Sequence, residues 1–268
     1  MSAPTAPIRI GIGGWTFEPW RGLFYPDKLP QKRELEYAAG KLTAIEVNGT
    51  YYGSQKPESF AKWHDETPDG FVFALKGPRF ATNRRVLAEA GGSVEKFLTS
   101  GLTELKAKLG PINWQFMPTK KFDPADFEAF LKLLPASHEG LPLRHVVEVR
   151  HDSFRNPEFV EMARAYKVGV VIAGDSEHPL IPDLTAPFVY ARIMGTREEE
   201  PAGYGEAELE SWAARARHWS EGRTPPELGN TLLAPPASTD PREVFLFVIS
   251  GFKPRNPAAA MALIDRTR

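Results

Sequence analysis

Short apolar segments alternate with longer amphipathic segments along this chain of 268 residues. The apolar segments are six or seven residues long, which is typical of buried strands, and they start roughly 30 residues apart. The predicted strands are IRIGIG (8–13), TAIEVN (43–48), FVFALK (71–76), PINWQF (111–116), HVVEVR (145–150), VGVVIA (168–173), PFVYARI (187–193) and VFLFVIS (244–250).

Helix start signals stand in several intervals. Asp123-Pro124 and Asn156-Pro157 each offer a polar N-cap residue followed by proline at the first helical position. Asn256-Pro257 repeats this signal near the C-terminus, and Ser93 can cap a further helix. Apolar residues then recur with helical spacing. These stripes are Phe97, Leu98, Leu102 and Leu105; Phe127, Phe130, Leu131 and Leu134; Phe159, Met162, Ala163 and Tyr166; and Leu209, Trp212, Ala213 and Ala216.

Eight strands alternating with helices predict an α/β fold with parallel strands. A (β/α)8 TIM barrel fits this length, and an open doubly wound sheet is the alternative. The segment DSEHPLIPDLTAP (175–187) contains three prolines, so we expect the sixth helix to be short or missing. We expect a single domain over residues 1–268, with residues 1–7 flexible. The proline-rich stretch 221–241 joins a helix to a strand, which predicts an insertion on the N-terminal face of the barrel.

Composition and charge narrow the class of protein. Hydrophobic residues make up 42% and charged residues 25% of the chain, which is typical of a globular protein. The net charge of −1 does not indicate a general attraction to nucleic acid or to anionic membranes. The absence of cysteine excludes disulfides, thiolate metal sites and cysteine nucleophiles. No apolar run resembles a signal peptide or a membrane span, so we expect a cytoplasmic protein.

Polar residues gather at the C-terminal ends of the predicted strands. In VVEVRHDSF (146–154), Glu148 and Arg150 share one face because side chains alternate across a strand with a period of two. Active sites of TIM barrels lie at this end of the strands, and an unpaired buried charge is costly. These residues therefore predict a functional pocket at the barrel mouth. The other polar residues at strand ends are Glu46, Asn48, Lys76, Gln115, Asp175 and Arg192.

The residue types restrict the chemistry of this pocket only in part. Lys76, Arg150 and Arg192 can hold a phosphate or a carboxylate, and arginine offers bidentate geometry. Glu148, Glu46 and Lys76 are the candidate catalytic residues, and the two glutamates can act as acid and base if their environments separate their pKa values. Glu148 can equally be the structural partner of Arg150 or Lys76, and both interpretations stay open.

The loops after the first three predicted strands add aromatic and basic residues. GGWTFEPWRGLFYP (13–26) contains Trp15, and NGTYYG (48–53) contains Tyr51. Both side chains can bind a ligand by stacking on a sugar or a base, or they can simply pack their own loops. GPRFATNRR (77–85) brings three arginines that can cover an anionic ligand or lie in solvent.

Metal and cofactor sites have little support. GIGGW is rich in glycine, but no helix start follows at once, so it does not predict a dinucleotide site. His151 and His178 are the histidines near strand C-termini. Either one, with Glu148 and Asp175, would give a metal mixed oxygen and nitrogen ligands. The spacing of these residues forms no metal signature, so we expect neither a metal nor a cofactor.

Five motifs resemble the YecE-like family, known as domain of unknown function 72. They are GGWTFEPWRGLFYP, AIEVNGTYY, FVFALKGPRFATN, LGPINWQFMP and VVEVRHDSF, and the resemblance extends over about residues 8–265. The resemblance implies a TIM barrel and no established activity. The strand-end residues that match the family are Glu46, Asn48, Lys76, Gln115, Glu148, Arg150, His151 and Arg192.

The chain departs from the usual pattern of this family in two places. Members of the family that the chain resembles often have arginine–x–histidine–glycine after the seventh strand, whereas this chain has Arg192-Ile193-Met194-Gly195. The last strand of the family often ends in paired asparagines, whereas this one ends in Ile249-Ser250-Gly251. A mechanism that needs that histidine or those amides does not carry over to this chain.

These patterns favour a barrel enzyme that acts on a small anionic or polyhydroxylated substrate, such as a sugar phosphate or a nucleotide-like compound. The reaction type stays open between isomerase, lyase and hydrolase. One alternative is a non-catalytic module that binds a phosphorylated ligand or single-stranded nucleic acid through the Arg79–Arg85 loop and the aromatic residues of the mouth. A third is a metal-dependent hydrolase. We expect a small anionic molecule as the partner, with nucleic acid less favoured and no membrane contact.

Overall fold

The computed structural model describes residues 5–236 and 238–268 of the protein. The expectation of a flexible N-terminus falls partly on residues 1–4, which lie outside the described residues. The next residues are bound to the body of the molecule. The N–H of Ala6 donates to the carbonyl of Ser220 at 3.0 Å, and the carbonyl of Pro7 accepts from the N–H of Val244 at 2.9 Å.

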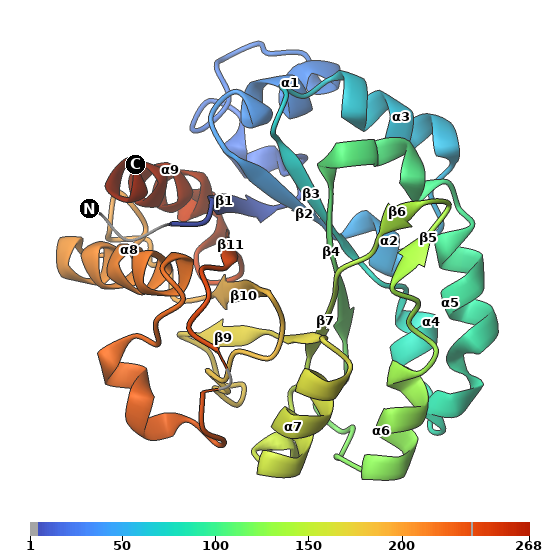
Figure 1. The fold of residues 1–268 in the computed structure, drawn as a ribbon. Coiled ribbons are helices and arrows are strands. Elements are labelled where there is room, and N and C mark those ends of the chain that lie inside the picture. The colour runs from blue at the N-terminus through green and yellow to red at the C-terminus, as the bar shows by residue number, and fades with distance from the viewer. Residues whose placement is uncertain (1–4, 237) are drawn as a thin grey trace.

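Parallel strands form the centre of the molecule (Figure 1). Their order around the sheet is β8-β7-β4-β3-β2-β1-β11-β10-β9. Each of the eight predicted strand segments is present. The strands of this sheet are β1 (Ile8–Gly13), β2 (Ala44–Val47), β3 (Val72–Lys76), β4 (Leu109–Gln115), β7 (His145–Glu148), β8 (Gly169–Val170), β9 (Ile172–Gly174), β10 (Phe188–Ile193) and β11 (Glu243–Val248). A small antiparallel pair, β5 (Ser137–His138) and β6 (Leu141–Pro142), lies outside it.

The two ends of this sheet are halves of one strand. β8 pairs with β7, and β9 pairs with β10. Only Val171 separates the two halves, and its N–H donates to the carbonyl of Val147 at 2.9 Å. The chain therefore closes the ring at the sixth strand. The predicted TIM barrel is confirmed, and the open sheet is not formed.

Helices follow most of the strands and surround the barrel (Figure 1). The helices are α1 (Glu34–Ala39), α2 (Gly49–Tyr52), α3 (Pro57–Asp65), α4 (Arg79–Thr82), α5 (Gly91–Leu98), α6 (Pro124–Leu131), α7 (Pro157–Ala165), α8 (Glu206–Ser220) and α9 (Asn256–Thr267). Residues 175–187, which are all described, hold no helix, as their prolines predict. Short 3-10 turns occupy Glu18–Trp20, Gln31–Arg33, Leu87–Ala90, Leu102–Lys108, Asp152–Phe154, Pro226–Thr231 and Lys253–Arg255.

The predicted helix caps are confirmed at two positions and wrong at two. Asp123 accepts the N–H of Asp126 at the start of α6, and Asn156 caps α7 in the same way. Ser93 is not a cap, because α5 starts directly after a 3-10 turn and Ser93 lies inside its first turn. Asn256 is buried and cannot cap α9, because its amide bonds Thr196 and Ser250 instead.

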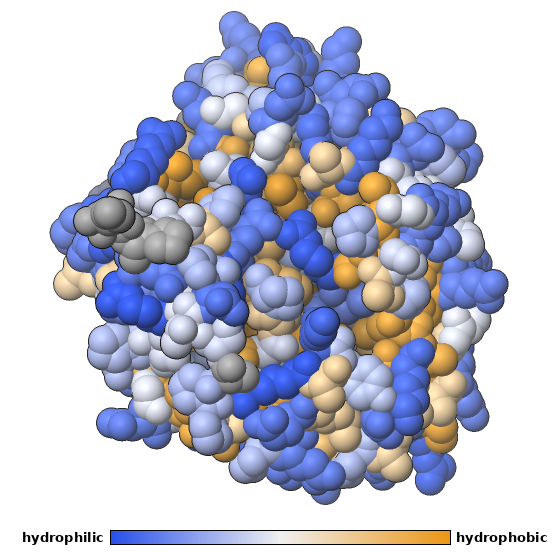
Figure 2. Space-filling model, viewed as in Figure 1, coloured by the Kyte–Doolittle hydropathy of each residue, from blue (hydrophilic) through white to orange (hydrophobic). Residues whose placement is uncertain are grey.

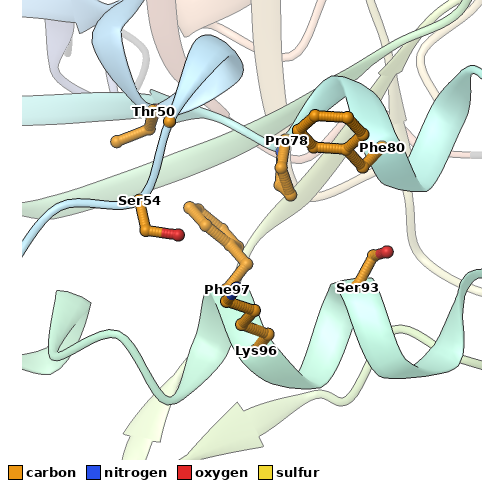
Figure 3. A pocket seen from close by; sticks show the side chains of 8 residues that line it. Thr50, Ser54, Pro78, Phe80, Ser93, Lys96 and Phe97 are labelled. Atoms are coloured by element: carbon orange, nitrogen blue, oxygen red, sulfur yellow. The ribbon is translucent and has the colours of Figure 1, made fainter.

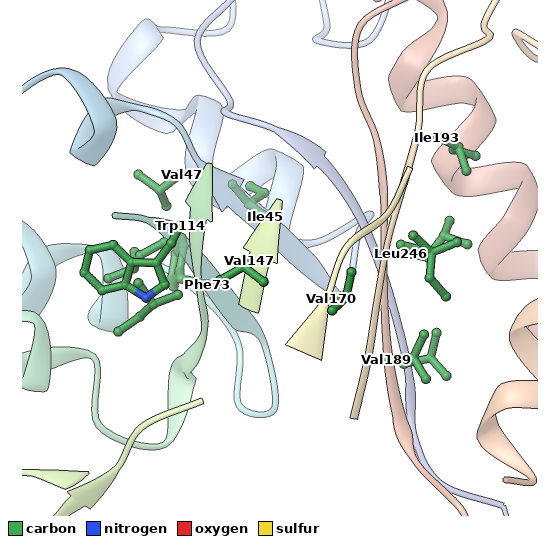
Figure 4. Packing of buried hydrophobic residues seen from close by; sticks show 14 of the residues in the cluster. Ile45, Val47, Phe73, Trp114, Val147, Val170, Val189, Ile193 and Leu246 are labelled. Carbon is green, nitrogen blue, oxygen red and sulfur yellow. The ribbon is translucent and has the colours of Figure 1, made fainter. Parts of the chain in front are cut away.

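The core has two apolar layers, one on each side of the barrel wall. The outer layer packs strand residues such as Ile45 and Val147 against the helices (Figure 4). The inner layer fills the barrel with Ala44, Val146 and other strand residues. Neighbouring residues of a strand belong to different layers because their side chains alternate. Every second residue of a strand therefore faces the barrel interior. At the C-terminal ends of the strands, these inward-facing residues are polar.

Residues 221–236 and 238–241 connect α8 to β11. They lie against the segment that leads into β10, because the carboxylate of Asp183 accepts the N–H groups of Leu233 and Ala234 at 3.0–3.1 Å. The guanidinium of Arg242 also donates to the carbonyl of Ala186 at 3.2 Å. These contacts join two stretches that both precede barrel strands.

The surface is mixed in character. Figure 2 shows hydrophilic residues over most of one face, with hydrophobic residues in patches between them. Within residues 5–236 and 238–268, no helix combines the length and the hydropathy needed to cross a membrane. The large hydrophobic residues with high exposure are Leu23, Tyr52, Phe80, Val86 and Met117. All five lie in connections that follow β1, β2, β3 or β4, so they surround half of the barrel mouth.

Candidate functional site

An ion network closes the barrel interior at the C-terminal ends of the strands. Arg192 on β10 lies between two carboxylates: it donates to Glu46 on β2 at 3.0 Å and to Glu148 on β7. The hydroxyl of Tyr190 donates to the second oxygen of Glu46 at 2.6 Å. Arg150 donates to Glu148 through Nε at 2.8 Å and through Nη2 at 2.5 Å. Strands that are distant in sequence are thus joined across the barrel.

Lys76 lies beside this network at the end of β3, and only 5% of its surface is exposed. Its ammonium donates to the side-chain oxygen of Gln115 on β4 and lies 4.7 Å from the ring centre of Tyr51. It forms no ion pair within 4.0 Å in the described part of the chain. Its backbone is fixed by Thr50, whose hydroxyl donates to the Lys76 carbonyl at 2.7 Å. Lys76 is therefore a buried cation with few partners.

The surroundings shift the pKa values of two of these groups, one in the sense of its burial cost and one against it. Burial and, next, the nearby Arg192 lower the pKa of Lys76 to about 8, against the opposing effect of Glu46. Burial alone would raise the pKa of Glu148, but the charges of Arg192 and Arg150 outweigh it and bring the pKa to about 2. Glu148 is therefore ionised at neutral pH. Lys76 can gain or lose a proton at a pH close to neutral.

The charges of this group do not cancel. Arg192 and Arg150 balance Glu46 and Glu148, which leaves the ammonium of Lys76 as a surplus positive charge. Two buried atoms of the network also lack a partner among the described residues, Nε of Arg192 and Oδ1 of Asn113. A positively charged site of this kind suits an anion.

The other predicted site residues have different surroundings. Asn48 follows β2 and lines a pocket beside the network. His151 is engaged by its own turn, because Nδ1 contacts both the N–H and the hydroxyl of Ser153. The carboxylate of Asp175 accepts the indole N–H of Trp212 at 2.9 Å. Neither His151 nor Asp175 contacts the ion network directly.

Trp15 packs against other aromatic rings. Its ring lies edge-on to Trp63 at 5.2 Å and to Phe73 at 6.3 Å, measured between ring centres. It also lines the same pocket as Asn48. Trp15 therefore serves the packing of its loop and still presents a surface to the pocket.

Two residues of the site were not predicted. Tyr190 and Asn113 each stand two positions before a predicted residue, Arg192 and Gln115, on the same strand face. The same alternation rule would have found both. His178 lies in the long segment after β9, where burial lowers its pKa and Arg150 lowers it further. The sequence placed His178 near a strand C-terminus but did not indicate its proximity to Arg150.

The arginine-rich loop after β3 is partly ordered by its own contacts. Arg84 donates to the carbonyl of Phe80 at 3.0 Å and to the hydroxyl of Ser93 at 3.2 Å. The guanidinium of Arg79 lies over the rings of Phe80 and Tyr52, which are 61% and 65% exposed. Phe80 also borders a small pocket of about 110 Å³ between α2, α4 and α5 (Figure 3).

The residues considered for a metal do not come together. Glu148 is surrounded by arginines, and Asp175 is bound to Trp212. Over the described ranges, no three histidine, aspartate or glutamate side chains form a group that could hold a metal ion. The geometry therefore does not support the metal-dependent alternative.

Comparison with known proteins places the chain in a family. The family model described as "Protein of unknown function DUF72" matches residues 9–266. The chain belongs to the DUF72 family. The resemblance to the YecE-like family that the sequence motifs carry is thereby confirmed, and so is the extent of the resemblance along the chain.

Two relatives of the chain are UPF0759 proteins from Escherichia coli and Bacillus subtilis. The chain is 30% identical to UPF0759 protein YecE of Escherichia coli over 55% of its own length and 50% of that protein. It is 24% identical to UPF0759 protein YunF of Bacillus subtilis, over 68% of this chain and 64% of YunF. The matched region thus spans half to two thirds of these relatives.

A solved DUF72 structure extends the comparison to the whole chain. The crystal structure of a DUF72 family protein from Thermotoga maritima has a TM-score of 0.67 and 23% identity. The match covers 96% of this chain and 97% of that one. It shows that both have the same fold.

Proposed function

We propose that the protein is a barrel enzyme that binds a small anionic or polyhydroxylated substrate, such as a sugar phosphate, at the C-terminal mouth. Lys76 and Arg150 hold the anionic group of this substrate. The observation that carries the proposal is the ammonium of Lys76, which is buried beside balanced ion pairs. Among the described residues it has one hydrogen-bond acceptor, Gln115, and no carboxylate within ion-pair distance. A buried cation is costly unless it is paired, and an anionic ligand supplies the missing pair.

Lys108 shows how a buried lysine of this protein is satisfied when its role is structural. Its ammonium donates to the carbonyls of His64 and Thr67 at 2.5 and 2.6 Å, and it also contacts the Thr67 hydroxyl. Every N–H of Lys108 thus has an acceptor within the protein. Lys76 has equal burial but a single such acceptor among residues 5–236 and 238–268, which favours a role in ligand binding.

Arg150 offers the second contact to the anion. Its Nε and Nη2 are fixed by Glu148, so the guanidinium is held in one orientation. Its Nη1 forms no hydrogen bond with the described residues, and 19% of the side chain is exposed. A guanidinium that is fixed along one edge and open along the other is suited to a phosphate or carboxylate oxygen.

Lys76 is also the group best suited to exchange a proton with the substrate. Its pKa of about 8 is near neutral pH, where a catalytic base or acid works most effectively. Glu46 and Glu148 were the other candidates, but both are occupied by Arg192, and the low pKa of Glu148 makes it a poor proton donor. We assign the two carboxylates to the positioning of Arg192 and Arg150.

Calorimetric titration with inorganic phosphate tests this proposal. The wild-type protein should bind one phosphate, and Arg150→Ala should weaken binding about tenfold to hundredfold, because a charge-assisted hydrogen bond contributes about 1.5–3 kcal/mol. Arg150→Lys keeps the charge but loses the planar fork, so its affinity should also fall while its melting temperature changes little. Arg85→Ala, which changes an exposed arginine of the loop after β3, is the matched control.

The proposal fails if the wild-type protein binds no phosphate, or if both Arg150 variants bind it as tightly as the wild type. Tight and salt-dependent binding of an oligonucleotide, without binding of phosphate, would instead favour the nucleic-acid alternative. Exposed Tyr52 and Phe80 with Arg79 between them would then be the contact surface.

A further inference from the structure

A second pocket lies next to the ion network at the barrel mouth. It has a volume of about 350 Å³ and lies where β1 and β2 end. Its lining includes two indole rings, two side-chain amides, a lysine and bare backbone. These residues are Trp15, Trp63, Asn48, Gln55, Lys253, Gly13 and Gly14.

This pocket shares a wall with the site of Lys76. Val47 on β2 is paired with Leu75 on β3, so the parallel register places the next residues, Asn48 and Lys76, side by side. Neighbouring strands lie about 4.8 Å apart, which is less than the length of a sugar. A ligand bound at Lys76 can therefore extend past Asn48 into the pocket.

Lys253 supplies a second cation without a counter-charge. It follows β11, and its ammonium lies 4.2 Å from the ring centre of Phe17 and 5.4 Å from that of Trp20. In the described part of the chain this ammonium forms no ion pair and no hydrogen bond. Burial lowers the pKa of Lys253. The aromatic rings hold the ammonium in place, and an anion near it would remove the cost of its partial burial.

We infer that this pocket is the second subsite of the proposed site and that the ligand carries two separate anionic groups on a polyhydroxylated chain. Lys76 and Arg150 bind one anionic group, and Lys253 binds the other. The amides of Asn48 and Gln55 can donate to and accept from hydroxyl groups between them. Trp15 provides an apolar face for the carbon atoms of a sugar. The inference rests on the proposed function and makes it more specific, because it names sugar bisphosphates or phosphorylated sugar acids as the class.

Calorimetry on the full chain with three probes tests the inference. The probes are inorganic phosphate, fructose 6-phosphate and fructose 1,6-bisphosphate. The wild-type protein should bind the bisphosphate at least tenfold more tightly than the monophosphate. Lys253→Met should remove this advantage and leave the affinity for inorganic phosphate unchanged. Lys41→Met is the matched control, because Lys41 also lies over an aromatic ring, that of Tyr37 at 5.9 Å, but does not line the pocket.

The outcomes separate the two proposals. If phosphate binds and depends on Arg150, but the bisphosphate gains nothing or Lys253→Met has no effect, the second subsite is refuted and the proposed function stands. If the wild-type protein binds none of the three probes, both proposals fail. Melting temperatures of Lys253→Met and Lys41→Met that match the wild type would ensure that any lost affinity reflects the missing ammonium and not a damaged fold.

Discussion

Lys76 lowers the stability of the folded protein at neutral pH. Its pKa falls from 10.5 to about 8 on folding, chiefly because its burial disfavours the charged form. Below pH 8 the ammonium is charged in both the folded and the unfolded protein, and the folded protein bears the full cost of burying it. This cost is about 3 kcal/mol. A residue kept at such a cost at the mouth of a barrel is better explained by binding than by packing.

The pH dependence of stability tests this account of Lys76. Between pH 8 and pH 10.5 the folded protein has lost the proton while the unfolded chain still holds it, so the free energy of unfolding should rise with pH. Relative to Lys76→Met, the wild-type protein should gain up to about 3 kcal/mol over this window. Urea unfolding of both proteins at pH 7 and pH 10 measures the difference. If the wild type and Lys76→Met differ in free energy of unfolding by the same amount at both pH values, Lys76 has an ordinary pKa.

At the scale of the elements, the strands and several helix starts could be predicted because their signals are local. Alternation within a strand also identified the inward-facing charges, including Glu46, Glu148 and Arg192. It could not identify their partners, because Arg192 bridges strands that are distant in sequence. Alternation could not predict the orientations of the loop residues His151 and Asp175. These depend on contacts within a turn for His151 and with α8 for Asp175.

Helix capping allows a direct comparison of a correct and a wrong prediction. Asp123→Ala should destabilise the protein by about 1 kcal/mol, because the carboxylate satisfies a free N–H at the start of α6. Ser93→Ala should cost less, because Ser93 lies inside α5 and its hydroxyl only accepts from Arg84. Chemical denaturation of both variants measures the difference. Equal losses would contradict the assignment of Asp123 as the cap.

At the scale of the whole molecule, the barrel interior changes character along its axis. Its lower part is apolar, with Val72, Phe188 and Phe245, whereas its C-terminal layer contains Glu46, Glu148 and Arg192. Bulky apolar layers usually fill such barrels and stabilise them. The charged layer fixes Arg150 and balances its own charges, so the ammonium of Lys76 is the surplus positive charge at the mouth.

The most direct measurement is a crystal structure of the protein grown without sulfate or phosphate and then soaked with selenate. Selenate is a tetrahedral anion that anomalous scattering can locate. The account predicts one well-occupied selenate within hydrogen-bond distance of Nζ of Lys76 and Nη1 of Arg150. Selenate found only at other places on the surface, with Lys76 and Arg150 in contact with no anion, would contradict it.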